Sequence, residues 1–227
     1  MAKTTKTTKK AAGKEHESIL DKLGAVKLRV RLTFTEEVLG TASNDPELHA
    51  NYIAKNAPDA PKFKEEIEAI GVGDMIERQM TVFPKDENFK PFVWDYQIKG
   101  FFKDARKSLR KVAGSESAAV TAFKTVIDGN IFIEERKIPF QNYGRIGECQ
   151  RSLRADTPQG PRTALAHSET VGSGSFIELT IRIMEIEKKK FDLVEAVKEW
   201  LDYGEVRGLG QWRNSGKGTF VWEEITE

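Results

Sequence analysis

Two segments alternate strictly between apolar and polar residues, and they constrain the fold more than any other feature. In residues 25–35 the apolar positions are Val26, Leu28, Val30, Leu32 and Phe34, and in residues 175–184 they are Ile177, Leu179, Ile181 and Ile183. A period of two sustained over such lengths predicts β-strands with one buried face. The other face of the first strand is basic, with Lys27, Arg29 and Arg31, which suits a nucleic-acid platform.

Three segments have helical periodicity. In residues 90–112 the apolar positions recur every three or four residues: Ile98, Phe101, Phe102, Ala105, Leu109 and Val112. The other side of this helix holds Lys99, Lys103, Arg106, Lys107, Arg110 and Lys111, with Asp104 as its single acid. Such a charge run is either a solvated face or a phosphate-facing surface, and its one-sided sign favours the second.

Shorter elements follow the same logic. Residues 115–127 are predicted to form a second helix with Ser115 as its cap, ended by residues 128–130, before a short strand at 131–135. Residues 191–201 have a helical stripe, and a short strand is predicted at 219–225.

Residues 141–168 contain four arginines and no lysine: Arg145, Arg151, Arg154 and Arg162. A turn signal at residues 157–160 separates two extended arms, so we expect a long β-hairpin at about 141–170. Arginine forks bind phosphate in a bidentate manner and stack on bases. His167 in the second arm is a candidate catalytic residue, with a structural or surface histidine as the alternative.

A glycine-rich loop lies between residues 207 and 219. Its glycines are Gly208, Gly210, Gly216 and Gly218, and between them lie Gln211, Trp212, Arg213, Asn214, Ser215 and Lys217. Glycine lets a backbone approach a ligand closely, and two cations with an indole suit a phosphate and a base. The alternative is a helix-to-strand connection that simply needs glycine.

Residues 1–22 are Lys/Thr-rich and nearly devoid of apolar side chains, which predicts a flexible basic arm. Such an arm either grips nucleic acid or is a solvated tail. Residues 23–227 are predicted to form a single domain. Within it, residues 36–90 read as an insertion with short helices at 46–55 and 62–70, the first capped by Asp45.

Composition excludes several classes of protein. The chain has 36 Lys and Arg against 35 Asp and Glu, so any cationic surface must be local. A single cysteine, Cys149, excludes an intramolecular disulfide and a cysteine-rich zinc site. No apolar run has the length of a membrane span and no signal peptide is visible, so we expect a cytoplasmic protein without a membrane partner. Paired carboxylates, metal-spaced histidines, a nucleophile elbow and a Walker loop are also missing from the sequence, so no cofactor is expected.

The order of these elements predicts an α+β fold with a ferredoxin-like or RRM-like core (β-α-β-β-α-β), insertions and a long β-hairpin thumb. Three stretches, LTFTEEVLGT at 32–41, YQIKGFFKDARKSL at 96–109 and GLGQWRNSGKGTF at 208–220, resemble the RAMP superfamily. Within that superfamily the chain is most similar to the backbone subunits of CRISPR effector complexes, which polymerise along guide RNA. The whole sequence is also similar to uncharacterised proteins encoded by bacteriophages and prophages, which implies a stand-alone form in the host bacterial cytoplasm.

The resemblance implies roles for particular residues. The loop around Gly210, Gln211 and Trp212, with Arg213, Asn214 and Lys217, would hold phosphates. Lys99, Lys103 and Arg106 would do the same, and the arginine hairpin would lie as a thumb over a neighbouring stretch of nucleic acid. The loop departs from the family pattern, which more often has small residues and Ser-Arg in place of residues 211–214.

Three functions follow from these observations. The preferred one is a binding protein for single-stranded RNA or DNA that lacks sequence preference and assembles head to tail along the strand. The second is a metal-dependent endoribonuclease that uses Asp45 or His167, and only this one would need Mg²⁺. The third is a phage protein that mimics a CRISPR backbone subunit and interferes with host defence.

Overall fold

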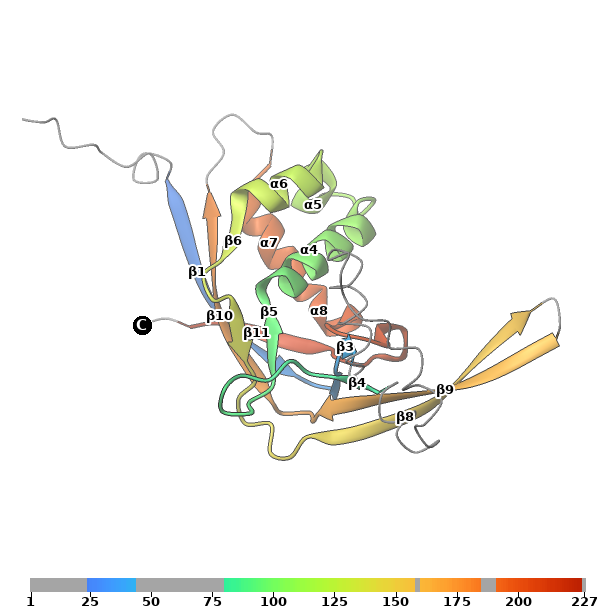
Figure 1. Ribbon diagram of the computed structural model, residues 1–227. Coiled ribbons are helices and arrows are strands. Elements are labelled where there is room, and N and C mark those ends of the chain that lie inside the picture. Colours follow the sequence, from blue (N-terminus) through green and yellow to red (C-terminus); the bar gives the residue numbers. More distant parts are fainter. Residues whose placement is uncertain (1–23, 44–79, 158–159, 185–190, 226–227) are drawn as a thin grey trace, which may run out of the picture.

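The computed structural model describes residues 24–43, 80–157, 160–184 and 191–225 (Figure 1). It has a mixed α+β architecture, as predicted. The predicted arm at 1–22, the predicted helices at 46–55 and 62–70, and Asp45 lie outside the described residues. The predicted single domain of residues 23–227 therefore stays a prediction.

A four-stranded sheet with the order β11-β1-β10-β6 forms the centre of the molecule. Its strands are β1 (Ala25–Phe34), β6 (Ile131–Ile133), β10 (Phe176–Met184) and β11 (Phe220–Glu224), and every neighbouring pair is antiparallel. The two alternating segments therefore form the two central strands. Leu28 and Ile181 are opposite each other in the register and both are buried, as the alternation requires.

The described helices lie on one side of this sheet, against its apolar face (Figure 1). The helices are α4 (Asp95–Leu109), α5 (Glu116–Ala119), α6 (Phe123–Asn130), α7 (Leu193–Asp202) and α8 (Gly204–Arg207). Phe102 of α4 packs against Trp200 of α7, and Phe101 contacts Phe220 of β11, with ring centroids 5.7 and 5.4 Å apart. Each fully buried aromatic ring contributes about 2–3 kcal/mol to folding, so this layer is a principal source of stability.

Two predicted helices differ from the observed ones. The helix predicted at 90–112 begins only at Asp95, because the preceding residues form strand β5 (Phe92–Trp94), which pairs with β7 (Lys137–Pro139). The helix predicted at 115–127 is split into α5 and α6. Ala122 adopts a left-handed conformation (φ 47°) between them, and the carbonyl oxygen of Val120 accepts a hydrogen bond from Arg106 instead of continuing the helix. Residues 128–130, expected to end this helix, are the last three residues of α6, so the predicted C-terminal end is correct.

The predicted hairpin is present as β8 (Gly147–Thr157) and β9 (Gly160–Val171), paired along their whole length. It projects away from the helices (Figure 1). At its base, β9 also pairs with β2 (Val38–Leu39) and β4 (Thr81–Val82), and β4 pairs with β3 (Ala42–Ser43). The described flanks of the predicted insertion are thus built into the sheet of the hairpin.

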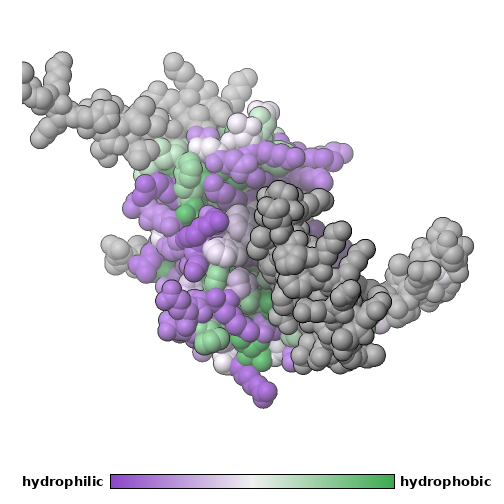
Figure 2. Space-filling view, in the orientation of Figure 1, coloured by the Kyte–Doolittle hydropathy of each residue, from purple (hydrophilic) through white to green (hydrophobic). Residues whose placement is uncertain are grey.

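The open face of the central sheet is not a bare cationic platform. Arg31 is paired with both Glu178 and Glu223, at 2.7 and 3.0 Å. Lys27 and Arg182 both contact Glu134. Carboxylates on the neighbouring strands β10 and β11, and Glu134 just after β6, therefore neutralise Lys27 and Arg31 of β1. Figure 2 shows mostly hydrophilic residues on the described part of the visible face, with smaller hydrophobic patches between them.

Two glycines test the packing of the helices. A Cβ added at Gly204 of α8 would lie 2.2 Å from the ring of Phe220, whereas one added at Gly100 of α4 meets no atom within 4 Å. Gly204→Ala is therefore expected to destabilise the protein by about 2 kcal/mol. Gly100→Ala should instead stabilise it by about 0.5–1 kcal/mol, since alanine is the better helix former. Thermal denaturation of both variants checks this, and equal melting temperatures would contradict the placement of α8 on β11.

Candidate nucleic-acid interface

The glycine-rich loop crosses one end of the central sheet between α8 and β11. Leu209 N–H donates to the carbonyl of Gly218 (2.8 Å), and Gly218 N–H donates to the carbonyl of Glu37 (2.9 Å). Gly218 has φ 73°, and a Cβ there would lie 1.9 Å from the carbonyl oxygen of Leu209. Only glycine fits at this crossing, so the sequence fixes the two arms of the loop against each other.

Trp212 lies at the tip of this loop in a left-handed conformation (φ 53°), directly before the short 3-10 helix η2 (Arg213–Ser215). A non-glycine residue rarely adopts this conformation, and it costs about 1 kcal/mol or more. The side chain of Trp212 is nevertheless 38% exposed. Strain together with an exposed indole is typical of a binding site rather than of a simple connection.

The hairpin meets the loop at Arg151. Its guanidinium lies 4.9 Å from the centre of the Trp212 ring, and its Nη2 donates to Gln211 Oε1, 60 positions along the chain, at 3.3 Å. Its Nη1 donates to Ser168 Oγ at 3.3 Å, and its Nε is buried without a hydrogen-bond partner among the described residues. Both bonds are long, so the two terminal nitrogens, rather than the buried Nε, are the donors that a ligand would compete for.

A second cluster joins the loop to α4. Asp104 Oδ2 accepts hydrogen bonds from Arg207 Nε and Arg213 Nη1, both at 2.9 Å, and Arg207 Nη1 donates to Asn214 Oδ1 at 2.6 Å. Partial burial raises the pKa of Asp104, but the hydrogen bonds and charges of the two arginines outweigh it and leave the pKa below its ordinary value. One carboxylate thus holds two guanidinium groups, which gives the cluster a net positive charge.

Lys217, on the return arm of the loop, contacts two carboxylates. Its Nζ lies 2.9 Å from Glu37 Oε1 and 3.3 Å from Glu36 Oε2. The hydrogen bond to Glu37 is the largest influence and raises the pKa of Lys217, with Glu36 acting in the same direction. The ammonium group is therefore charged and anchored to the segment that follows β1.

The other predicted cations of α4 lie away from this loop, against α6 and β6. Lys103 pairs with Asp128 at 2.6 Å, Lys99 lies over the ring of Phe132, and Arg106 lies over the ring of Phe123. Desolvation lowers the pKa of Lys99 and of Arg106. None of these three side chains contacts the glycine loop. The structure therefore keeps the two predicted phosphate sites, one on α4 and one on the loop, apart.

The remaining predicted residues lie along the hairpin. Arg145 is exposed before β8, and makes no ion pair with another described residue. Arg154 and Arg162 lie near the tip, opposite Thr163 and Ala155. His167 Nε2 lies 3.1 Å from Glu148 Oε2, while its Nδ1 is buried without a partner among the described residues.

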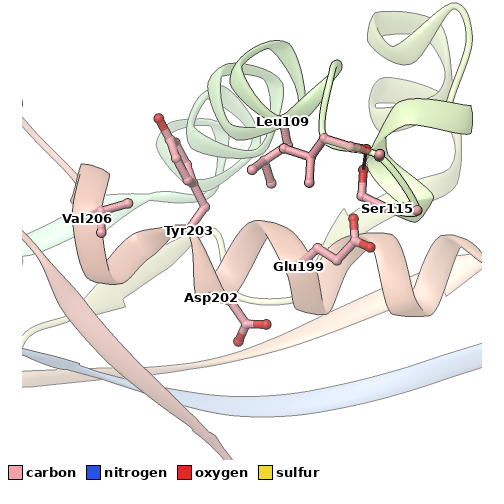
Figure 3. Close-up of a pocket in the computed structure, with 9 residues that line it drawn as sticks. Leu109, Ser115, Glu199, Asp202, Tyr203 and Val206 are labelled. Carbon is pink, nitrogen blue, oxygen red and sulfur yellow. Dashed lines mark hydrogen bonds between the residues drawn. The ribbon is translucent and has the colours of Figure 1, made fainter.

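Other parts of the described chain offer no metal site. No group of three or more His, Cys, Asp or Glu side chains there could hold a metal ion. A groove of about 460 Å³ lies between the C-terminal end of α4 and α7 (Figure 3). Its acids are already engaged, because Glu199 accepts hydrogen bonds from the backbone at the start of α5 and Asp202 accepts one from Trp222. No helix among the described residues is long and apolar enough to cross a membrane.

Sequence reasoning missed two residues of the interface. Arg207 looks in the sequence like an ordinary cation in the last turn of a short helix. Its position directly before Gly208, however, places it at the start of the loop. Asp104 was noted only as an exception within a basic run. Its exceptional sign was the available signal, since a lone acid between cations marks a counter-ion position.

No protein-family model matches the sequence, and no curated protein matches it either. Among solved structures, the chain is similar to one in the cryo-EM structure of the type III-B Cmr-beta bound to cognate target RNA. The match has a TM-score of 0.45 and 13% sequence identity, and it covers 92% of this chain and 61% of the other. The chain therefore spans less than two thirds of that neighbour's length.

The Asp104 cluster has a measurable pH dependence. Because the pKa of Asp104 is lowered in the folded state, its ion pairs stabilise the protein above the ordinary carboxyl pKa, and this contribution is lost as pH falls through the folded value. We expect Asp104→Asn to be less stable than the wild type by about 1 kcal/mol at pH 7, and the gap to narrow at pH 3. Urea denaturation at both pH values measures it. A gap that stays constant would show that the carboxylate charge is unimportant.

Proposed function

We propose that the protein binds single-stranded nucleic acid, RNA or DNA, at the junction between the glycine loop and the base of the hairpin. The observation that carries this proposal is the guanidinium of Arg151 over the exposed indole of Trp212, with long hydrogen bonds from both of its terminal nitrogens. An aromatic plane beside a guanidinium is the usual chemistry for holding an unpaired base next to its phosphate.

Stacking on Trp212 explains why the binding would tolerate many sequences. Every base has a flat face, and a base stacked on an aromatic side chain gains about 1–3 kcal/mol whatever its identity. Two polar groups beside this position, Gln211 and Ser168, already accept hydrogen bonds from Arg151 and are not free to read the edge of a base. We therefore propose little discrimination between bases at this position.

The phosphate groups would contact the two arginines of the Asp104 cluster. Arg207 and Arg213 converge on one carboxylate oxygen, which occupies the position that a phosphate oxygen would take in a complex. Asn214 and Lys217 lie on the same loop and extend this surface. An incoming strand would compete with Asp104 for the two guanidinium groups, so the carboxylate would lower affinity rather than abolish it.

The scaffold supports a finer interpretation, which we also propose. The strand order β11-β1-β10-β6, with helices on one face, is the arrangement expected of a ferredoxin-like core of the RAMP type. The long hairpin supports assembly of copies head to tail along the strand, because an arm that projects from the body can reach a neighbouring copy.

The binding site is tested by Arg151→Ala and Trp212→Ala. Each variant should bind a fluorescent oligonucleotide about tenfold more weakly in anisotropy titrations, equally for different sequences, because each removes one stacking partner. Arg213→Ala should also flatten the salt dependence, lowering the slope of log K against log salt by about 0.7.

Two further variants are compared with these, one expected to leave affinity unchanged and one expected to raise it. Arg110→Ala removes an exposed cation outside the junction and should leave affinity unchanged. Asp104→Asn removes the competing charge and should raise affinity. Full-strength binding by both the Arg151 and Trp212 variants would refute this site.

Assembly is tested separately by sedimentation velocity with oligonucleotides of increasing length. If copies line up along the strand, the number bound should rise in steps with length, and each step should bind at least as tightly as the first. The free protein at the same concentration is the control. One copy bound at every length would refute the assembly while leaving the binding site intact.

A further inference from the structure

A second aromatic cluster lies where β5 leads into α4. Phe92, Trp94 and Tyr96 alternate along the chain, and the rings of Trp94 and Tyr96 are stacked, with centroids 6.2 Å apart and planes 16° from parallel. Phe92 supports Trp94 edge-on at 4.8 Å. Exposure rises outward along the row, from 3% at Phe92 to 55% at Tyr96. The row is therefore anchored in the core at one end and open to solvent at the other.

Two cations are fixed over these rings. The guanidinium of Arg136 lies 5.2 Å from the centre of Trp94 and 5.6 Å from that of Tyr96, and it is held there by an ion pair with Asp95. Lys137 Nζ lies 5.5 Å from the centre of Phe92. The pairing of β5 with β7 sets these positions, because it places Trp94 opposite Lys137. The cluster is thus preorganised by backbone pairing.

We propose that this cluster is a second base-stacking site, which takes another nucleotide of the strand bound at the loop–hairpin junction. The inference rests on the proposed function. A half-exposed tyrosine beside a stacked guanidinium offers a base a flat surface, and an arginine plane stacks on bases as aromatic rings do. Arg136 and Lys137 against Asp95 leave the cluster one positive charge, which attracts a phosphate backbone and disfavours a basic peptide.

A short segment connects the two sites. Gln97, in the first turn of α4, donates through Nε2 to Thr41 Oγ1 at 2.7 Å. Thr41 lies two residues after Leu39, against which the glycine loop packs: a Cβ at Gly210 would lie 3.2 Å from the Leu39 carbonyl oxygen. Residues 39–41 thus contact a neighbour of each site, Gln97 on one side and Gly210 on the other. We expect a strand that binds at Trp212 to follow this segment to Tyr96.

The test is the length dependence of binding. Tyr96→Ala should weaken binding of oligonucleotides of about 16 residues by about tenfold and leave oligonucleotides of about 4 residues unaffected, because only the longer ones reach both sites. Trp212→Ala should weaken both. Tyr96→Phe keeps the ring and should bind like the wild type, and circular dichroism confirms that the exposed substitution leaves the fold intact. Ultraviolet crosslinking of the longer oligonucleotide should attach it to the peptide that contains Tyr96.

The possible results separate the two proposals. If Trp212→Ala weakens binding but Tyr96→Ala matches the wild type at both lengths, the second site is wrong and the proposed function stands. If the wild type binds neither length, the proposed function falls and this inference with it. Binding of a proline-rich peptide at Tyr96, with no crosslink to the oligonucleotide, would overturn the inference in favour of a peptide site.

Discussion

The pairing of β11 with β1 is the interaction on which the candidate interface depends. Thr33 and Phe34 of β1 are in register with Val221 and Phe220 of β11, so the end of the chain returns beside its first strand. The connection from α8 must then cross the end of the sheet where β2 begins and where the hairpin is rooted. Because β2 pairs with β9, this crossing places the loop against the base of the hairpin. The contact of Trp212 with Arg151 follows from this route.

Charge in this protein is balanced locally as well as in total. Arg31, Lys103 and Lys217 each contact a carboxylate, and Asp104 serves two arginines at once. Within the part of the chain that the structure describes, these cations and carboxylates therefore lie in close pairs. Any polyanion that binds here must exchange places with carboxylates, which makes its affinity sensitive to salt.

The sequence predicts local features well, because they depend on periodicity along the chain. The alternation of residues 25–35 and 175–184 correctly predicted β1 and β10, and the helical stripe correctly predicted α4 and α7. Non-local contacts were beyond it. The neutralisation of Arg31 depends on its register with Glu178, and the break at Ala122 depends on a hydrogen bond from Arg106 to Val120. No pattern within either segment encodes such partners.

The candidate site shows the same division. Glycine spacing correctly located a constrained loop, since Gly218 fits only without a side chain. The four hairpin arginines, by contrast, look equivalent in the sequence, and of the two whose side chains the structure describes, Arg145 and Arg151, it is Arg151 that meets the loop. Which arginine does so is decided by the pairing of β8 with β9, and this depends on the register between distant residues.

The strand β9 belongs both to the projecting hairpin and to the sheet at its base, and this has a mechanical consequence. Its outer part belongs to the projecting hairpin, whereas its inner end is clamped between β2 and β8. A strand of this length extends about 40 Å, so β9 is a long arm whose inner end is held by its pairing with β2, β4 and β8. A force on the tip therefore becomes a torque at Thr170 and Val171, which β2 transmits to Leu39 and the loop that rests on it. A partner that binds the tip of the hairpin would therefore also exert a force on the candidate site where the glycine loop meets the base of the hairpin.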